Sequence, residues 1–196
     1  MFKKTLLISA ILAATTSIAI ANTAPYVGAG LGIITNTSSN FADASKKDGN
    51  KTTIFGHPSN FRGVPLNVFA GYGGVITQRF YLAGEFSGTI ATAEISDDHG
   101  LKTNYGYGVS ILPGYMLTDH TLGFVRGSVV RSRFSDVGKT QTGGQVGVGL
   151  QTTLTQNIDV RGEYDYTSYG SFNNSIGNIS SPSSDAFNAA LIYKFD

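Results

Sequence analysis

The stretch FNAALIYKFD, residues Phe187–Asp196, decides the fold because its side chains alternate between two different faces. One face carries Phe187, Ala189, Leu191, Tyr193 and Phe195, and the other carries Asn188, Ala190, Ile192 and Lys194. A period of two is that of a β-strand. An apolar face with aromatic residues near its end predicts a strand that faces lipid.

The first 21 residues read as a secretion signal. Lys3 and Lys4 precede an apolar run from Leu6 to Ile20, which closes on the small-residue site Ala19-Ile20-Ala21. The run is shorter than the ~20 mainly apolar residues of a spanning helix, and serine and threonine interrupt it, which argues against an uncleaved anchor. We therefore predict cleavage before Asn22, leaving one domain over residues 22–196.

Composition excludes several classes of protein. Removing Lys3 and Lys4 leaves 12 basic against 13 acidic residues, so the mature chain lacks the basic excess of a nucleic-acid-binding protein. Cysteine is absent, which excludes a disulfide framework and thiolate chemistry. The 25 glycines, 10 tyrosines and 12 phenylalanines suit a chain of short strands and turns.

Alternation of apolar and polar residues predicts eight strands, at residues 26–34, 66–75, 80–94, 103–116, 122–134, 144–155, 158–169 and 187–196. The strand at 144–155 is the most regular. The strand at 122–134 is the least regular, because placing Val125 and Val129 outward leaves Phe124 and Val130 inside with Arg126.

The connections alternate in length. Short connections are expected at 76–79, 117–121 and 156–157, and long polar loops at 36–63, 95–102, 135–143 and 170–184. Short turns at one rim and long loops at the other are typical of an outer-membrane barrel. Because lipid offers no hydrogen-bond partners, a spanning sheet must close. The predicted fold is all-β, an eight-stranded antiparallel up-and-down transmembrane β-barrel whose narrow lumen side chains fill.

A soluble barrel of lipocalin type is the alternative, because it also alternates and is also secreted. Its apolar face would point inward and its charged residues would point to water. The apolar face of this chain, however, carries tyrosines and phenylalanines near the strand ends, as in the aromatic girdles of membrane barrels. We therefore favour the transmembrane interpretation.

Three segments carry a family resemblance: Tyr26-Val27-Gly28-Ala29-Gly30-Leu31-Gly32, Leu112-Pro113-Gly114-Tyr115 and Arg161-Gly162-Glu163-Tyr164-Asp165-Tyr166. With these the chain resembles the small outer-membrane barrels that include OmpA-type transmembrane domains and opacity-like surface proteins of Gram-negative bacteria. The resemblance implies export through the periplasm to the outer membrane, contact with its lipid, and insertion by the barrel assembly machinery. Leu191, Tyr193 and Phe195 then correspond to the C-terminal insertion signal, although Asp196 follows the final aromatic residue here.

Four charged residues are expected inside the barrel. Glu85, Arg126, Arg161 and Glu163 lie on inward faces, four to six residues from the short-turn rim. They are expected to pair across the lumen, because a lone buried ion costs several kcal/mol. We interpret them as a structural plug. The alternative is a gate in a narrow porin-like channel for small solutes or ions.

Two further regions are candidates for contacts outside the barrel. Arg131 and Arg133 face outward near the long-loop rim, where they can hold lipopolysaccharide phosphates, or lie solvated above the membrane. The loop from Thr35 to Gly63 is the longest and carries Phe41, Phe55 and Phe61. It is the candidate surface for a host or surface ligand, the alternative being a variable cover without a ligand.

Catalysis receives little support. The histidines are His57, His99 and His120, and Asp97-Asp98-His99 is similar to the acid and histidine chemistry of omptin proteases. We favour a polar loop tip over a protease or a lipid A-modifying enzyme at the rim. No cofactor and no metal site are expected. The sequence thus predicts a non-enzymatic surface protein with a structural or adhesive role.

Overall fold

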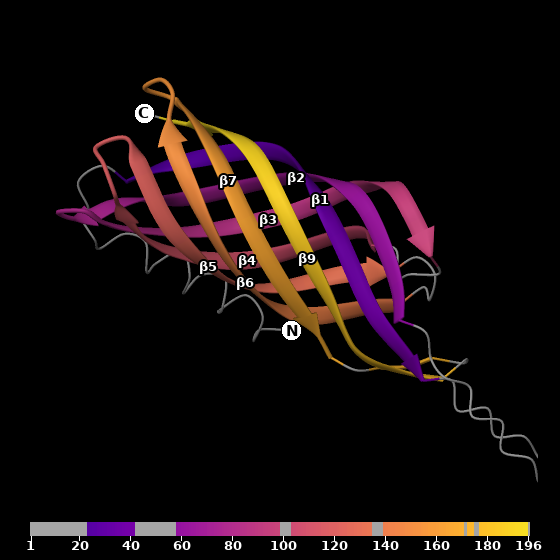
Figure 1. The fold of residues 1–196 in the computed structure, drawn as a ribbon. Coiled ribbons are helices and arrows are strands. Elements are labelled where there is room, and N and C mark those ends of the chain that lie inside the picture. The colour runs from indigo at the N-terminus through magenta and orange to yellow at the C-terminus, as the bar shows by residue number, and fades with distance from the viewer. Residues whose placement is uncertain are drawn as a thin grey trace, which may run out of the picture.

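The computed structural model describes residues 23–41, 58–98, 103–134, 139–170, 172–174 and 177–195. The predicted signal peptide lies outside this part. The described strands are β1 (Thr23–Phe41), β2 (Pro58–Thr77), β3 (Phe80–Asp98), β4 (Thr103–Met116), β5 (Thr121–Phe134), β6 (Lys139–Thr153), β7 (Ile158–Tyr169), β8 (Phe172–Asn174) and β9 (Gly177–Lys194). All the pairings are antiparallel, and β1 pairs with β9, which closes an eight-stranded barrel (Figure 1). Strand β8 forms a small hairpin with β9. The predicted fold is confirmed.

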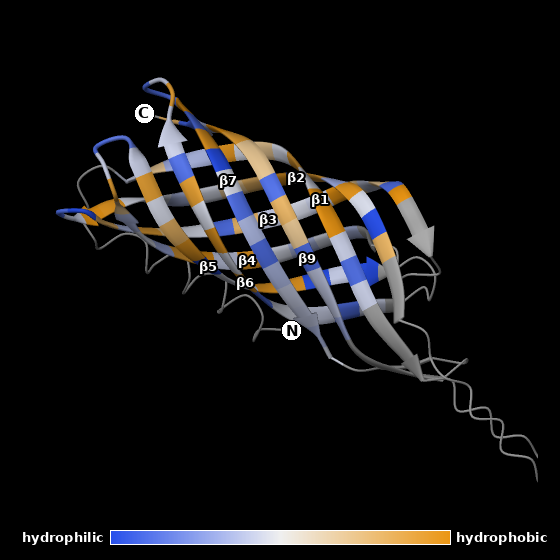
Figure 2. Ribbon diagram, in the orientation of Figure 1, coloured by the Kyte–Doolittle hydropathy of each residue, from blue (hydrophilic) through white to orange (hydrophobic). Residues whose placement is uncertain are grey.

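The two faces of each strand lie as predicted. On β4, Ile111 is 63% exposed whereas its neighbour Leu112 is fully buried. Even the irregular strand β5 holds Val125 and Val129 outside and Arg126 inside. Figure 2 shows hydrophobic and hydrophilic residues alternating along the strands, and the large hydrophobic ones of this pattern are exposed on the outside of the barrel. The soluble alternative with inverted faces is therefore wrong.

The strands run further than hydropathy predicted. β1 continues to Phe41 and β2 begins at Pro58, and β3, β6 and β9 likewise extend into segments expected to be loops. Alternation of apolar and polar residues is needed only where one face meets lipid. Beyond the membrane the backbone can keep pairing with polar residues on both faces, so alternation underestimates strand length.

The barrel mouth is uneven. The ladder between β3 and β4 ends at Thr89 and Gly106, whereas the ladder between β2 and β3 continues to Phe61 and Asp97. At the same end, β1 pairs with both β2 and β9 as far as residues 39–41. A sheet of β9, β1, β2 and β3 therefore projects beyond the rest of the barrel at the loop end (Figure 1).

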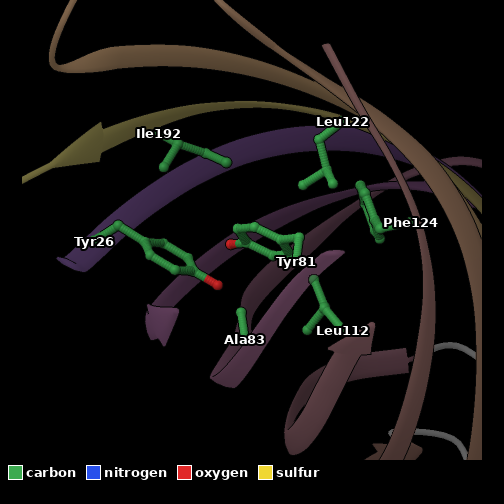
Figure 3. Close-up of a cluster of buried hydrophobic side chains, with 7 residues drawn as sticks. All are labelled: Tyr26, Tyr81, Ala83, Leu112, Leu122, Phe124 and Ile192. Carbon is green, nitrogen blue, oxygen red and sulfur yellow. The ribbon is translucent and has the colours of Figure 1, made fainter. Parts of the chain in front are cut away.

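An apolar cluster fills the lumen near the short turns (Figure 3), formed by Tyr26, Tyr81, Ala83, Leu112, Leu122, Phe124 and Ile192. Two glycines make room for its rings. A Cβ atom at Gly71 would lie 2.5 Å from the ring of Tyr26, and one at Gly149 would lie 2.5 Å from that of Phe124. These distances are too short for a Cβ atom unless the ring shifts, so glycine lets each ring lie close to the backbone.

No helix in the described part of the chain is long and apolar enough to cross a membrane.

Candidate functional site

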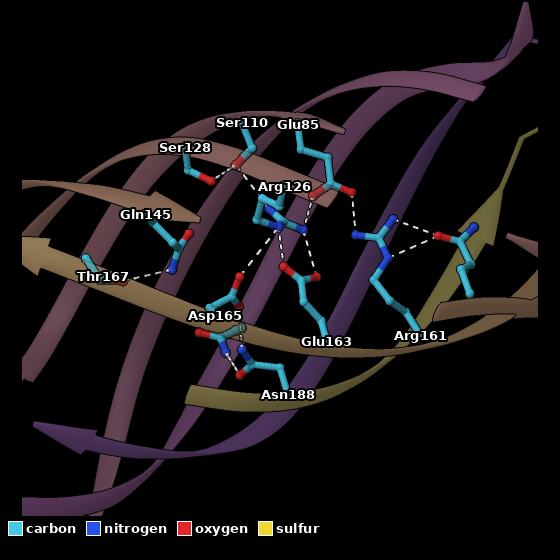
Figure 4. Close-up of polar contacts among 12 residues, drawn as sticks. Glu85, Ser110, Arg126, Ser128, Gln145, Arg161, Glu163, Asp165, Thr167 and Asn188 are labelled. Carbon is cyan, nitrogen blue, oxygen red and sulfur yellow. Dashed lines mark hydrogen bonds and ion pairs between the residues drawn. The ribbon is translucent and has the colours of Figure 1, made fainter. Parts of the chain in front are cut away.

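The lumen brings together the four charged residues predicted to face inward (Figure 4). Glu85 comes from β3, Arg126 from β5, and Arg161 and Glu163 from β7. All four are buried, because the alternation that sends their neighbours into lipid directs them to the axis. We call these four residues the lumen charge cluster.

Glu85 is the hub of the lumen charge cluster. Its Oε2 accepts a hydrogen bond from Arg126 Nη2 at 2.7 Å, and its Oε1 accepts one from Arg161 Nη1 at 2.5 Å. The hydroxyl of Tyr26 donates to the same Oε1 at 2.9 Å. Both carboxylate oxygens are therefore used, as a buried charge requires.

The two arginines have different second partners. Arg126 donates to Glu163 Oε2 at 3.0 Å and to Ser110 Oγ at 3.0 Å, and its Nε faces Glu163 Oε1. Arg161 donates twice to Gln151 Oε1, at 3.0 and 2.8 Å. The Arg161 guanidinium also lies against three aromatic rings. It is 5.1 Å from the ring centroid of Phe124 and 5.9 Å from that of Tyr26, both in the apolar cluster, and 4.9 Å from that of Phe69, which packs against the cluster. Aromatic faces attract a cation most strongly where water is excluded.

A second ion pair lies closer to the turns and was not among the predicted site residues. Lys194 Nζ lies 2.8 Å from Asp159 Oδ1, and Gln151 Nε2 donates to Asp159 Oδ2 at 2.7 Å. Gln151 thus links this pair to Arg161. The signal was present in the sequence, because Asp159 and Lys194 share the inward faces of their strands with Arg161 and Ile192.

The lumen differs on the turn side and the loop side of the lumen charge cluster. Toward the turns it is filled by the apolar cluster. Toward the loops there is a cavity of about 130 Å³, whose lining includes Asn67, Ser132, Gln145, Asp165, Tyr169 and Asn188. Sequence reasoning places Phe124 inside but interprets the plug as polar, and so does not identify the apolar half that Phe124 forms with six other inward side chains.

The outward arginines lie as predicted, at the loop end of β5. Both are exposed, and Arg133 Nη1 donates to the hydroxyl of Tyr105 at 3.1 Å. The Arg133 guanidinium lies 5.8 Å from the centroid of the Tyr105 ring. On the neighbouring strands Arg131 pairs with Tyr107 and Thr142. Cations, phenols and hydroxyls therefore share one outward patch.

One part of the predicted contact loop is not a loop. Phe61 belongs to β2 and is fully buried, so it cannot serve as an exposed contact for a ligand. It pairs with Asn36 of β1, another buried residue. Phe55 and the side chain of Phe41 lie outside the described residues. Only residues 42–57 of the predicted loop lie between the end of β1 and the start of β2.

The segment compared with omptin proteases is divided. Asp97 and Asp98 end strand β3 rather than occupying a loop, while His57 and His99 lie outside the described residues. His120 is exposed in the turn between β4 and β5, at the opposite end of the barrel. Within the described ranges, no group of three or more acidic, histidine or cysteine side chains is placed to hold a metal ion.

The model of the outer membrane protein beta-barrel domain matches residues 5–195. No curated protein matches the chain significantly. Among solved structures, Neisserial surface protein A is 15% identical, with 89% of this chain and 100% of that chain covered and a TM-score of 0.46. The attachment invasion locus protein Ail of Yersinia pestis is 15% identical, with 86% and 98% covered and a TM-score of 0.43.

The family match extends over almost the whole chain, and the lipid-facing barrel described above agrees with it. The protein therefore lies in the outer membrane and belongs to the outer membrane protein beta-barrel domain family.

Proposed function

We propose that this protein is a non-enzymatic surface protein whose loops and projecting strands make structural or adhesive contacts, while its plugged lumen holds the barrel rigid. One observation carries the proposal. The turn half of the lumen is occupied by ion-paired and aromatic side chains, whereas at the loop end β1 keeps pairing with β2 and β9, and β2 with β3, beyond the last pair of β3 and β4. The chain therefore extends its surface outside the membrane and does not form an open pore.

The contact test removes the loop between β1 and β2 without touching either strand. Residues 42–57 are replaced by a short turn of glycine, serine and asparagine, and the variant is displayed on bacteria at the level of the parent. We expect binding to a cultured epithelial monolayer to fall several-fold. A matched control replaces residues 135–138, between β5 and β6, by glycine and serine. Unchanged binding by the first variant would remove this loop from the proposal.

A narrow channel is the second candidate, and the cavity on the loop side favours it. Ions would still have to pass the lumen charge cluster, where each arginine is held by at least two partners. We expect no discrete conductance steps when the purified barrel is added to planar bilayers. Regular steps that survive repeated purification would replace the plug by a gate.

We also propose that Arg131 and Arg133 contact lipopolysaccharide phosphates. Guanidinium groups can hold phosphate oxygens in pairs, and both side chains are exposed on one outward face. Replacing both by alanine should reduce the lipopolysaccharide that co-purifies with the barrel. Replacing Arg79, an exposed arginine in the turn between β2 and β3, is the control. Equal loss from both variants would refute a specific contact.

The C-terminal strand is the proposed recognition element for the barrel assembly machinery. Leu191, Tyr193 and Phe195 face outward, and the rings of Tyr193 and Phe195 pack edge to face at 5.1 Å. We expect Phe195→Ala to lower the yield of folded, heat-modifiable barrel in outer-membrane fractions. Phe80→Ala removes an equally exposed aromatic ring at the turn end of β3 and should leave the yield nearly unchanged. The same yield for both variants would contradict the assignment.

A further inference from the structure

We propose that Glu163 and Asp165 share one proton, held in a hydrogen bond between Glu163 Oε1 and Asp165 Oδ1, and that this proton makes the barrel less stable as the pH rises. The two side chains lie in the lumen, away from the contact surfaces proposed above. Their positions, the charges around them and the hydrogen bonds that they lack all point to the same proton.

Glu163 and Asp165 are neighbours on the inward face of β7, because residues two apart on a strand point to the same side. Both residues are buried, each only 5% exposed. Their carboxyl groups lie within hydrogen-bonding range of each other. Both also line the loop-side cavity, which has room for the water that would carry a proton to them.

Both carboxyl groups converge on one nitrogen atom of Arg126 (Figure 4). Its Nε faces Glu163 Oε1 and lies 4.0 Å from Asp165 Oδ1. The other two guanidinium nitrogens donate elsewhere, Nη1 to Ser110 and Nη2 to Glu85 and to the second oxygen of Glu163. Because Nε carries a single hydrogen, it cannot satisfy both of the oxygens that face it.

Each of these two facing oxygens lacks a hydrogen bond. Glu163 Oε1 and Asp165 Oδ1 are both buried, and neither accepts a hydrogen bond from the described residues. Such unsatisfied carboxylate oxygens are uncommon in protein interiors and call for a partner. A proton on either oxygen makes that oxygen a donor to the other, so one proton satisfies both.

The charges of the lumen call for the same proton. Four carboxyl groups point inward, from Glu85, Asp159, Glu163 and Asp165. The described cationic groups that pair with them are three, from Arg126, Arg161 and Lys194. A carboxylate without a counter-charge is costly in a buried site, and a single proton removes the excess charge.

The proton falls on this pair because the other two carboxylates are better stabilised. Glu85 accepts hydrogen bonds from two arginines and from the hydroxyl of Tyr26. Asp159 is paired with Lys194 and accepts a hydrogen bond from Gln151. Cationic and hydrogen-bonding partners of this kind keep a carboxylate ionised. Two carboxyl groups in contact, by contrast, do not both ionise easily, and they titrate as a pair.

The strands packed against the pair bring no second cation to it within the described part of the chain. On β6, Gly147 lies directly against Asp165, where a Cβ atom would be 2.2 Å from Oδ1. On β9, Asn188 donates its neutral amide to Asp165 Oδ2 at 2.9 Å. The other titratable side chains in this part of the lumen are Tyr26 of β1, Glu85 of β3, and Arg161 and Tyr169 of β7. Arg126 of β5 is therefore the cation that both carboxyl groups must share.

The shared proton makes the stability of the barrel depend on pH in a defined direction. In the unfolded chain both carboxyl groups are in water and are ionised above about pH 5. The folded barrel therefore binds one proton more than the unfolded chain, and a state that binds more protons loses stability as the pH rises. The loss ends once the folded pair has released its proton.

The test follows urea unfolding of the refolded barrel in micelles between about pH 5 and pH 9, where ordinary aspartate and glutamate stay ionised. The change of the free energy of unfolding with pH counts the protons exchanged on unfolding. Near neutral pH we expect wild type to release one proton more on unfolding than Asp165→Asn, which cannot ionise and can donate its amide to Glu163. Groups elsewhere in the chain, the histidines included, contribute equally to both proteins.

A second variant, Glu163→Gln, should remove the same proton, even where the loss of its charge lowers stability at every pH. Two controls should keep the wild-type slope. Asp185→Asn removes a carboxyl group on the outer face of β9, and Tyr169→Phe removes another titratable group from the cavity wall. An infrared difference spectrum of wild type against Asp165→Asn at neutral pH should contain the carbonyl band of a protonated carboxylic acid.

Equal slopes in wild type and Asp165→Asn would overturn the proposal, as would the absence of that carbonyl band. A slope that disappears in Asp165→Asn but persists in Glu163→Gln would overturn the sharing, because Asp165 would then hold the proton alone.

Discussion

The half of the lumen near the turns and the half near the loops are filled in different ways. On the turn side, rings and ion pairs lie in direct contact, from Ile192 and Phe124 up to Arg161 and Glu85. On the loop side, a cavity is lined by amides, hydroxyls and Asp165 together with the lumen charge cluster and apolar side chains such as Ile34 and Val130. A closed interior protects ion pairs from water and strengthens them, whereas an interior with room for water can accept groups that are incompletely paired. The turn side is therefore where stability is expected to concentrate.

The strongest test of this difference between the two halves is to remove Glu85, the hub of the lumen charge cluster. Glu85→Ala leaves Arg126 and Arg161 without their shared partner and should lower the free energy of unfolding by about 3–5 kcal/mol. Ser87→Ala, two residues further toward the loops on the same face, should cost no more than about 1.5 kcal/mol. Urea unfolding of both variants in micelles measures the difference. Similar costs would mean that the two halves are equally stabilising.

The outer face can be divided in the same way, by depth. Val148 is 60% exposed on β6, and an arginine there should destabilise the barrel by about 2–4 kcal/mol if the site lies near the bilayer midplane. Thr142→Arg, on the same face of the same strand but at the loop rim, should cost about 0–1 kcal/mol. Unfolding in lipid vesicles distinguishes the two. Equal penalties would misplace the barrel in the membrane.

The smallest expected effect compares one hydroxyl from each half. The Tyr26 hydroxyl donates to the charged Glu85, so Tyr26→Phe should cost about 1.5–3 kcal/mol. The Tyr169 hydroxyl lies 3.0 Å from Ser132 Oγ, a neutral partner, and Tyr169→Phe should cost about 0.5–1.5 kcal/mol. The reverse order in urea unfolding would place the stronger network on the loop side.

The fold could be predicted because lipid imposes a period of two wherever a strand crosses it. That constraint fixed the faces of even the irregular strand, where Phe124 and Arg126 point inward. It also placed the four members of the lumen charge cluster on inward faces. It could not identify Gln151 or Tyr26 as their partners, because a shared face does not determine which side chains meet across a lumen.

Strand ends and the roles of inward apolar residues could not be predicted in the same way. Hydropathy carries no information about pairing in water, so it predicts a loop at Phe41 and Pro58, which the structure places in β1 and β2. An aromatic residue in a polar segment, such as Phe61, suggests a surface contact, whereas the strand directs this side chain inward. Both errors arise where the membrane no longer imposes the pattern.

The closure of the barrel has a practical consequence for anyone labelling this protein. The amide of Phe195 donates to the carbonyl of Pro25 at 3.0 Å, so both flanks of the seam emerge beside the short turns. In an outer-membrane barrel the short turns face the periplasm. An epitope tag fused at either flank would be hidden from antibodies added to intact cells, and reporters of surface display belong between β1 and β2 instead.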